Sequence, residues 1–345
     1  MIKNNLKFIF GSLLISSVGF SACVSTDIEQ PGQPIKEYGD QLVINLQTPK
    51  HPATRADNTH KLRYTAKVYH LLNGTDIDLS SVQRKEIIDN GNSQENNVIV
   101  FKVDPDEKYR VFIFADYIPV ESNLNDRGEY TDYYYNTHIN SDYIAMNVTP
   151  GNTSSSKIDR AFFNNDYYDC FSYTDTVHKT ILKKELNCTL QRATAKIRVI
   201  ENSENKNNFA RLTFQAVPFV SQFNLTTGEC GLSQSTTSGL SSIQFDEFGN
   251  DDENELFYFY TLAGGKNSNT KHLDRLKFTV TNLQGKTTET EIEAQKIPIQ
   301  KNFITTIKGN FVAEEVQEPV LDLGDLILYM DVNNDWEGEQ TFNPN

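Results

Sequence analysis

Histidine is the residue type best suited to metal binding or acid–base catalysis, and its six copies are scattered along this chain. They are His51, His60, His70, His138, His178 and His272. None has the HxH, HExxH or HxxxH spacing that places two imidazoles on one metal ion. No GxSxG elbow, phosphate loop or GxGxxG turn is present either. The sequence therefore predicts no metal site, no cofactor and no enzyme activity; the alternative is a hydrolase whose groups meet only in the fold.

Two acidic segments contain the oxygen ligands that calcium prefers. Residues 246–255 include six carboxylates, and Asp331, Asn333 and Asp335 match the first, third and fifth positions of a calcium loop. In this second segment Trp336 stands where the loop requires Gly, and no Glu follows at the twelfth position. We interpret the first segment as a solvated loop and the second as a turn.

The four cysteines divide into one near the N-terminus, Cys23, and three in the body of the chain. An odd number of body cysteines implies no closed disulfide framework, and no CxxC metal pattern occurs. Cys170 and Cys188 could pair across neighbouring strands, or Cys170, Cys188 and Cys230 could all be buried free thiols. The sequence leaves both readings open.

The N-terminal segment has the layout of a signal peptide, predicted over residues 1–22. Lys3 and Lys7 precede an apolar run that is shorter than the ~20 residues needed to span a bilayer. The segment Phe20-Ser21-Ala22-Cys23 resembles the lipobox of bacterial lipoproteins, although Phe20 replaces the usual Leu. The resemblance implies that fatty acids such as palmitate are attached to Cys23. The alternative is an ordinary signal peptide with Cys23 as a bystander.

Residues 23–37 have the composition of a tether, with Pro31, Gly32 and Pro34 and no apolar period. The resemblance to bacterial lipoproteins implies that lipid on Cys23 holds the protein on the cell outer membrane, exposed at the surface. The net charge of −14 makes nucleic acid an improbable partner, because binding it requires a basic face.

Beyond the tether, short apolar and alternating segments between turn signals predict an all-β chain of sandwich type. The continuous apolar run at 108–115 favours a central strand, whereas 121–135 is expected to be loop and 143–147 a short helix. The expected strands are 41–46, 62–72, 98–103, 108–115, 183–200, 211–217, 220–225, 256–262, 276–281, 289–294 and 303–311. The polar run 201–208 divides an N-terminal domain, 38–202, from a C-terminal domain, 203–345.

Three short segments resemble motifs of the fimbrillin-like lipoproteins of Bacteroidales. Residues 190–199 contain their Arg-x-x-Ala-Lys-Ile strand, beginning at Arg192. Residues 297–311 are similar to their segment with Asn, Thr and Gly at fixed spacing, here Asn302, Thr305 and Gly309. Residues 334–338 resemble their closing strand. With the lipobox and an Arg after the first strand, the resemblance covers most of the mature chain.

The resemblance implies two transthyretin-like β-sandwich domains in tandem and a fimbrial (pilus) subunit or anchor that assembles by donor-strand exchange for cell adhesion. The exchanged first strand would contribute Leu42, Ile44 and Leu46 to the core, and an Arg-specific protease would cut after Arg55, with Arg63 as a rival site. Its partners would be other fimbrial subunits. A cut would make the protein a stalk or tip subunit in the fimbrium; an uncut chain would stay a lipid-bound anchor.

A glycan-binding surface lipoprotein that does not polymerise is the alternative function. Tyr130, Tyr133, Tyr134 and Tyr135 could stack on sugars and provide a site for a glycan or host ligand. Separately, Asp175-Thr176-Val177 resembles the O-glycosylation motif of Bacteroidales, which marks Thr176 as a candidate modification site.

Overall fold

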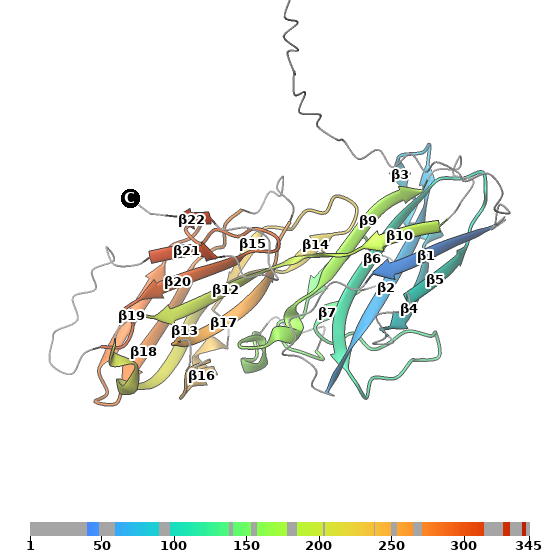
Figure 1. Cartoon of the computed structure of the whole chain (residues 1–345). Coiled ribbons are helices and arrows are strands. Elements are labelled where there is room, and N and C mark those ends of the chain that lie inside the picture. The colour runs from blue at the N-terminus through green and yellow to red at the C-terminus, as the bar shows by residue number, and fades with distance from the viewer. Residues whose placement is uncertain are drawn as a thin grey trace, which may run out of the picture. The chain divides into compact units, whose positions relative to one another are not determined.

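The computed structural model confirms an all-β chain (Figure 1). It describes residues 40–47, 59–89, 97–137, 141–152, 157–177, 185–202, 204–237, 239–249, 254–264 and 271–313, and the backbone of 327–331 and 340–342. Residues Glu37–Asn345 form one compact unit. Every regular element in these ranges is a β-strand or a short 3-10 helix. Within them, no helix has the length and apolarity needed to cross a bilayer.

The first half of the described chain forms two β-sheets. A three-stranded sheet has the order β10-β1-β5, and a larger sheet has the order β11-β9-β6-β2-β3, with β4 also paired to β2. Their strands are β1 (Gln41–Gln47), β2 (His60–Leu72), β3 (Asp76–Ile77), β4 (Gln83–Ile88), β5 (Asn97–Lys102), β6 (Tyr109–Pro119), β9 (Phe171–Val177), β10 (Glu185–Thr189) and β11 (Gln191–Arg192). The predicted central strand at 108–115 is β6, which pairs with both β2 and β9.

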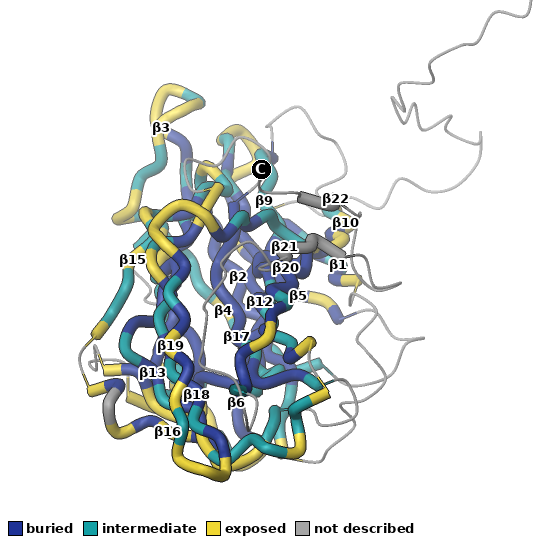
Figure 2. Tube along the Cα trace, turned by 90° about the vertical axis from the view of Figure 1, so that its left-hand side faces the viewer, coloured by how far each residue is buried: buried dark blue, intermediate teal, exposed yellow. Residues whose placement is uncertain are grey.

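Strand β2 is buried on both faces, which Figure 2 shows as dark blue along most of its length. Tyr64, Ala66 and Val68 lie on one face, and Ala66 is paired with Lys85 of β4. The Lys85 ammonium lies 5.4 Å from the centre of the Phe101 ring on β5, so this face is turned toward the three-stranded sheet. The opposite face carries Arg63 and Lys67, which are also buried. Charged residues are rarely buried without partners, so this face must be covered by polar groups as well as apolar ones.

The second half of the described chain forms two further sheets. Their orders are β17-β12-β20-β21-β22 and β15-β13-β18-β19, with β16 also paired to β13. The strands are β12 (Thr194–Glu201), β13 (Phe209–Val220), β15 (Ser233–Thr236), β16 (Gln244–Phe245), β17 (Glu255–Leu262), β18 (Leu276–Asn282), β19 (Thr287–Ile292), β20 (Ile304–Gly309), β21 (Ile327–Asp331) and β22 (Gln340–Phe342).

The change from one pair of sheets to the other falls at Ala193. Strand β11 ends at Arg192 and pairs with β9, whereas β12 starts at Thr194 and, among the described strands, pairs with β17 and β20. The polar run expected at the domain boundary contains a 3-10 helix, Glu204–Asn208, that follows β12. The pairing thus places β12 in the sheets of the second half. Only Ala193 separates β11 from β12, so the chain passes from one pair of sheets to the other as almost continuous strand. The division into 38–202 and 203–345 stays a prediction.

The short helix expected at 143–147 is wrong. Tyr143–Met146 is strand β8, in a small sheet of order β14-β8-β7 with β7 (Tyr135–Asn136) and β14 (Gln222–Asn224). Ile144 and Met146 are buried and alternate with more exposed neighbours, as strand geometry requires. One of its two partner strands, β14, is nearly eighty residues away in the chain, so no local pattern could indicate that pairing.

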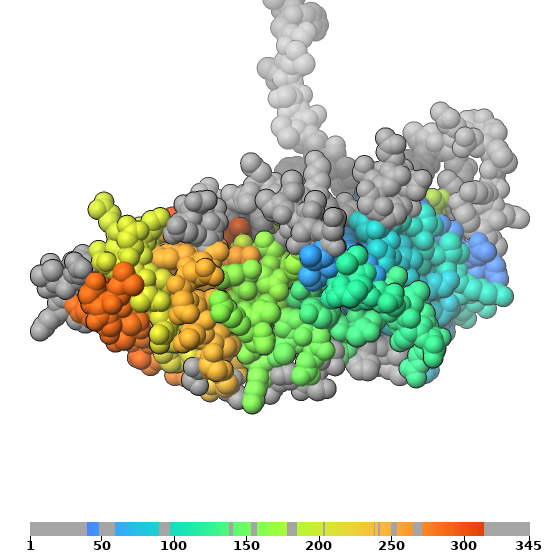
Figure 3. Space-filling model, turned by 90° about the horizontal axis from the view of Figure 1, so that it is seen from below, coloured from blue at the N-terminus to red at the C-terminus, as the bar shows by residue number. Residues whose placement is uncertain are grey.

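Two phenylalanines that precede β9 are buried among aromatic residues of the second half. Phe163 stacks on Phe214 of β13, with ring centres 4.2 Å apart, and meets Phe257 of β17 edge-on at 6.0 Å. Phe162 lies 5.9 Å from Phe259. Figure 3 shows the green surface of this part of the chain between the teal and the yellow-to-orange surfaces. Aromatic side chains from the first half therefore pack against strands of both sheets in the second half.

Candidate functional site

Strand β1 is the central strand of the three-stranded sheet, although it is the first strand among the described residues (Figure 1). It pairs antiparallel with β5, from Gln41 opposite Lys102 to Leu46 opposite Asn97. It pairs parallel with β10, where Asn45 lies opposite Asn187. Both backbone edges of β1 are thus occupied, which gives the strand an internal place in a sheet.

The inward face of β1 consists of Leu42, Ile44 and Leu46, each no more than 1% exposed. Alternation places all of them on one face of the strand, while Gln41 and Gln47 at its ends are exposed. Burying a side chain of this size stabilises a fold by about 1.5–3 kcal/mol. Much of the free energy that keeps β1 in the sheet therefore comes from apolar side chains at alternate positions. Any extended segment with the same alternation could supply them.

The outward face of β1 makes polar contacts with β10. Asn45 Nδ2 donates to Glu185 Oε1 at 2.7 Å and to Asn187 Oδ1 at 3.0 Å. Thr189 Oγ1 donates to Gln47 Oε1 at 2.9 Å. These contacts lie at the surface, so their effect on stability is modest, but they are specific to one alignment of the strands.

The outer edge of β5, away from β1, is covered by side chains of β4. Gln83 Nε2 donates to the carbonyl oxygen of Lys102 at 2.8 Å, and Lys85 Nζ donates to that of Val100. Backbone carbonyls that an added strand would use are therefore already bonded. Covering an edge with polar and charged side chains is a common protection against unwanted strand pairing.

Cys23 and Arg55 lie outside the described residues. Arg63, the rival cleavage site, is fully buried in β2 and bonded to carboxylates. A protease needs an exposed, extended segment, so Arg63 is not a site for cleavage of the folded protein.

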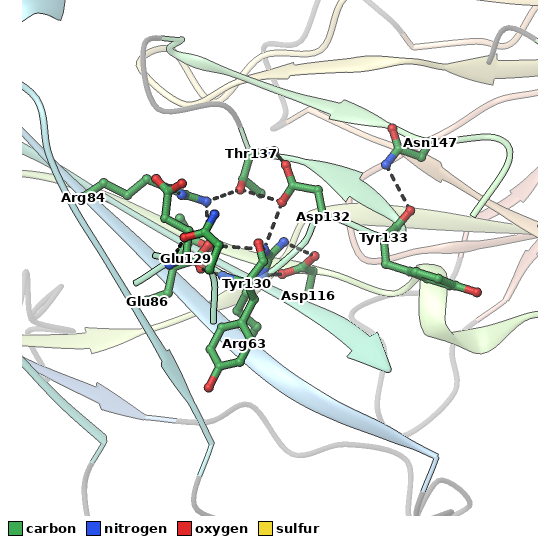
Figure 4. A network of polar contacts seen from close by, with 12 residues as sticks. Arg63, Arg84, Glu86, Asp116, Glu129, Tyr130, Asp132, Tyr133, Thr137 and Asn147 are labelled. Carbon is green, nitrogen blue, oxygen red and sulfur yellow. Dashed lines mark hydrogen bonds and ion pairs between the residues drawn. The ribbon is translucent and has the colours of Figure 1, made fainter. Parts of the chain in front are cut away.

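Arg63 is the centre of a buried network that the sequence did not predict (Figure 4). Its guanidinium donates to both oxygens of Asp116, at 2.9 and 2.8 Å, to Asp132 at 2.9 Å and to Glu86 at 3.2 Å. Burial lowers the pKa of Arg63, but the nearby carboxylates of Asp116, Asp132 and Glu86 outweigh this effect and raise the pKa above its ordinary value. Arg63 is therefore charged.

The same network fastens the segment 129–137 to the outer face of β2, β4 and β6. The backbone N–H of Tyr130 donates to Glu86 Oε2 at 2.6 Å, and Arg84 pairs with Glu129 at 2.6 Å. The Thr137 hydroxyl donates to Asp132 at 2.9 Å. The sequence signal that could have indicated this network is the occurrence of Lys61, Arg63 and Lys67 on one face of the otherwise largely apolar strand β2.

Lys67 lies on this face and gives the protein a pH-dependent stability. Its Nζ donates to the Ser141 carbonyl at 2.9 Å, and burial, with a smaller effect of Arg84, lowers its pKa to about 7. The unfolded chain, with a lysine pKa near 10.4, binds more protons above pH 7. The free energy of unfolding should therefore rise from pH 7 to 8.5, by up to ~1 kcal/mol per unit from this group.

The check is urea unfolding of the native chain and of Lys67→Met at pH 6.5, 7.5 and 8.5. The difference between the two curves isolates Lys67, because all other titrating groups are shared. We expect the native chain to gain stability relative to the variant as pH rises. Parallel curves would contradict a deprotonating Lys67.

Residues of the sequence motifs hold together the parallel strands β12 and β20. Arg192 Nε donates to both oxygens of Asp169 at 2.9 Å, and Arg192 Nη1 donates to Asn302 Oδ1 at 3.0 Å. Asn302 adopts a positive φ of 64° and its N–H bonds the Thr194 carbonyl at 2.9 Å. A Cβ on Gly309 would lie 2.7 Å from the Phe311 ring, so any larger residue would require this ring to move. These residues are structural.

Residues 33–343 match a family described as a family of unknown function, DUF6562. The chain belongs to this family. No curated protein matches the sequence of this DUF6562 protein.

Solved structures similar to this DUF6562 protein include fimbrial proteins of Bacteroidales. A fimbrial assembly protein from Parabacteroides distasonis is 13% identical with a TM-score of 0.39, covering 87% of this chain and 98% of its own. The tip fimbrial protein Mfa3 from Porphyromonas gingivalis has 13% identity and a TM-score of 0.39, covering 78% and 93%. The fimbrial anchor protein Mfa2 from Porphyromonas gingivalis has 13% identity and a TM-score of 0.40, covering 86% and 97%. At these TM-scores, no residue role transfers to this chain.

The tyrosines considered for sugar binding are mostly internal in this DUF6562 protein. Tyr134 and Tyr135 are buried, and the Tyr134 hydroxyl lies 3.0 Å from His60 Nε2. Tyr130 and Tyr133 are half-buried, and Lys61 Nζ lies 4.7 Å from the centre of the Tyr130 ring. Two of the four rings therefore cannot stack on a sugar in the folded protein.

The three body cysteines of this DUF6562 protein are free and buried. Burial raises the pKa of Cys188 to about 12 and also raises the pKa values of Cys170 and Cys230. The reading of buried free thiols therefore describes this structure, and the Cys170–Cys188 bond is not formed. Thr176 is half-buried within β9.

The acidic segments form no ion site in the part of this DUF6562 protein that the structure describes. Glu255 is buried and pairs with Arg198 at 2.8 Å, and Asp246 lies 3.7 Å from Arg211. Residues 250–253 and 332–339 lie outside the described ranges. Among the described residues, no three metal-binding side chains gather around one point.

Proposed function

We propose that this DUF6562 protein is a fimbrial structural subunit or anchor of the bacterial outer membrane, which assembles by donor-strand exchange and serves adhesion. The observation that carries the proposal is the place of β1. It is the first described strand of the compact unit, yet it lies between β5 and β10 with its apolar face fully buried. The first described strand thus completes the middle of a sheet.

A cut after Arg55 would leave β1 attached by non-covalent contacts alone. Its departure would open a slot whose walls are the backbone edges of β5 and β10. An extended segment of a neighbouring subunit could fill the slot, with main-chain hydrogen bonds giving affinity and alternate side chains entering the pockets of Leu42, Ile44 and Leu46. The covered outer edge of β5 would direct the incoming strand to this slot.

Lipid on Cys23 decides where the protein resides before and after such a cut. The uncut chain is held on the outer membrane through this lipid and functions as an anchor. A cut after Arg55 removes Cys23 together with β1, which releases the body as a stalk or tip subunit. Other fimbrial subunits are its partners in either form.

The test is treatment of the lipidated precursor with an Arg-specific protease. We expect a new N-terminus at Ala56 and a ladder of SDS-resistant oligomers. Arg55→Lys is the matched control, because it keeps the charge and removes the recognised residue, and it should give neither product. Cut protein that stays monomeric at high concentration would overturn the proposal.

A further inference from the structure

The Asn45 amide on the outward face of β1 bridges two positions of β10. Its Nδ2 group has two hydrogens, and the two acceptors Glu185 Oε1 and Asn187 Oδ1 lie at 2.7 and 3.0 Å. Asn187 is directly opposite Asn45, and Glu185 is the next residue on the same face of β10. Asn45 is half-buried and both partners are exposed, so this contact contributes to alignment more than to burial.

Apolar residues alone define the alignment of a strand in this slot incompletely. A slip of one residue would turn Asn45 into the core and is excluded by its cost. A slip of two residues keeps alternate residues inward and only changes which of them fill the pockets. After such a slip Asn45 would lie opposite Glu185 or Thr189, and it could reach only one of its two present acceptors.

A second contact on the same face marks the same alignment. The Thr189 hydroxyl donates to Gln47 Oε1 at 2.9 Å, and these residues are directly opposite each other. A two-residue slip breaks this bond as well. The outward face of β10 thus forms hydrogen bonds with polar side chains at two alternate positions of β1, Asn45 and Gln47.

We infer that Glu185 and Asn187 select an amide at the position of Asn45 in any strand that fills the slot between β5 and β10. This inference rests on the proposed function and specifies its partner. The partner is an extended segment with apolar residues at alternate positions and an outward-facing Asn before the last of them. An Asp at that position is selected against, because a carboxylate has no hydrogen to donate and would face Glu185.

The experiment uses the full mature chain, cut between β1 and β2 with an Arg-specific protease. Fluorescent peptides spanning residues 40–48 compete with the resident strand, and their incorporation is followed by size-exclusion chromatography. We expect the peptide with Asn45→Asp to be incorporated about tenfold less well than the native peptide. In a Glu185→Gln chain, the new amide can donate to the carboxylate of the Asn45→Asp peptide, so the difference should largely disappear.

The outcomes separate this inference from the proposed function. A peptide with Ile44→Asn should fail in both chains, since it disrupts the inward face. Equal incorporation of native and Asn45→Asp peptides into the native chain overturns the selection but leaves strand exchange intact. Failure of every peptide overturns exchange itself. Urea unfolding of the uncut chain then tests the role of Asn45. A lower midpoint for Asn45→Asp that Glu185→Gln restores would support selection of an amide at position 45 by Glu185. A lower midpoint that Glu185→Gln does not restore would overturn that selection.

Discussion

Replacing Ile44 by Asn should lower the free energy of unfolding by about 4 kcal/mol. Ile44 is fully buried at the centre of β1, with strands on both sides. The change removes apolar contacts, leaves a cavity and places an amide at a fully buried position among apolar side chains. Circular dichroism during urea unfolding measures the effect.

The matched control is Val43→Asn, the same new side chain one residue earlier. Val43 is half-buried on the outward face, so the amide can reach water and the loss should stay below about 1 kcal/mol. Similar losses for the two variants would show that β1 contributes no distinct inward face. That result would contradict the proposal that β1 fills a slot between β5 and β10 with its apolar face inward.

Alternation of apolar residues was sufficient to predict β1 and most of β2. Leu42, Ile44 and Leu46 have the period of two that a strand with one buried face requires, and Tyr64, Ala66 and Val68 continue it in β2. Proline and turn residues after each run set the ends. Such local signals predicted the strands, but they contain no information on which strands pair.

Strand β4 shows why other elements were not predicted. Its residues, Gln83–Ile88, are polar at most positions because one face carries the Arg63 network and the other provides Lys85 and Gln83 to β5. The pattern therefore resembles a loop. Strand β8 was missed for a different reason, since one of its two partners, β14, is distant in the chain and the nearer one, β7, contains only two residues. In both cases tertiary contacts outweighed local preference.

The candidate site was only partly accessible from sequence. The inward residues of β1 follow from periodicity, whereas the outward bond from Asn45 to Glu185 joins residues 140 positions apart. Its geometry depends on the parallel pairing of β1 with β10. No local sequence pattern indicates that these two strands lie side by side. Polar residues of this kind stay ordinary surface residues until the sheet order is known.

Replacing Arg63 by Met should lower the free energy of unfolding by about 3–5 kcal/mol. Methionine fills a similar volume, so the loss arises from charge rather than from a cavity. Asp116 would be left fully buried without its bidentate partner, and Asp132 and Glu86 would each lose a donor. Urea unfolding at pH 7.5 measures the loss, and proteolysis within 129–137 should become faster, because the network holds this segment.

The double variant Arg63→Met, Asp116→Leu tests whether the loss comes from the unpaired carboxylate. Removing both partners of a buried pair eliminates the uncompensated charge, so the double variant should be more stable than Arg63→Met alone. Arg63→Lys is a further control, which keeps the charge but cannot bond both oxygens of Asp116 and reach Asp132 together. A double variant less stable than either single variant would mean that the pair itself, and not the isolated carboxylate, determines the stability of this face.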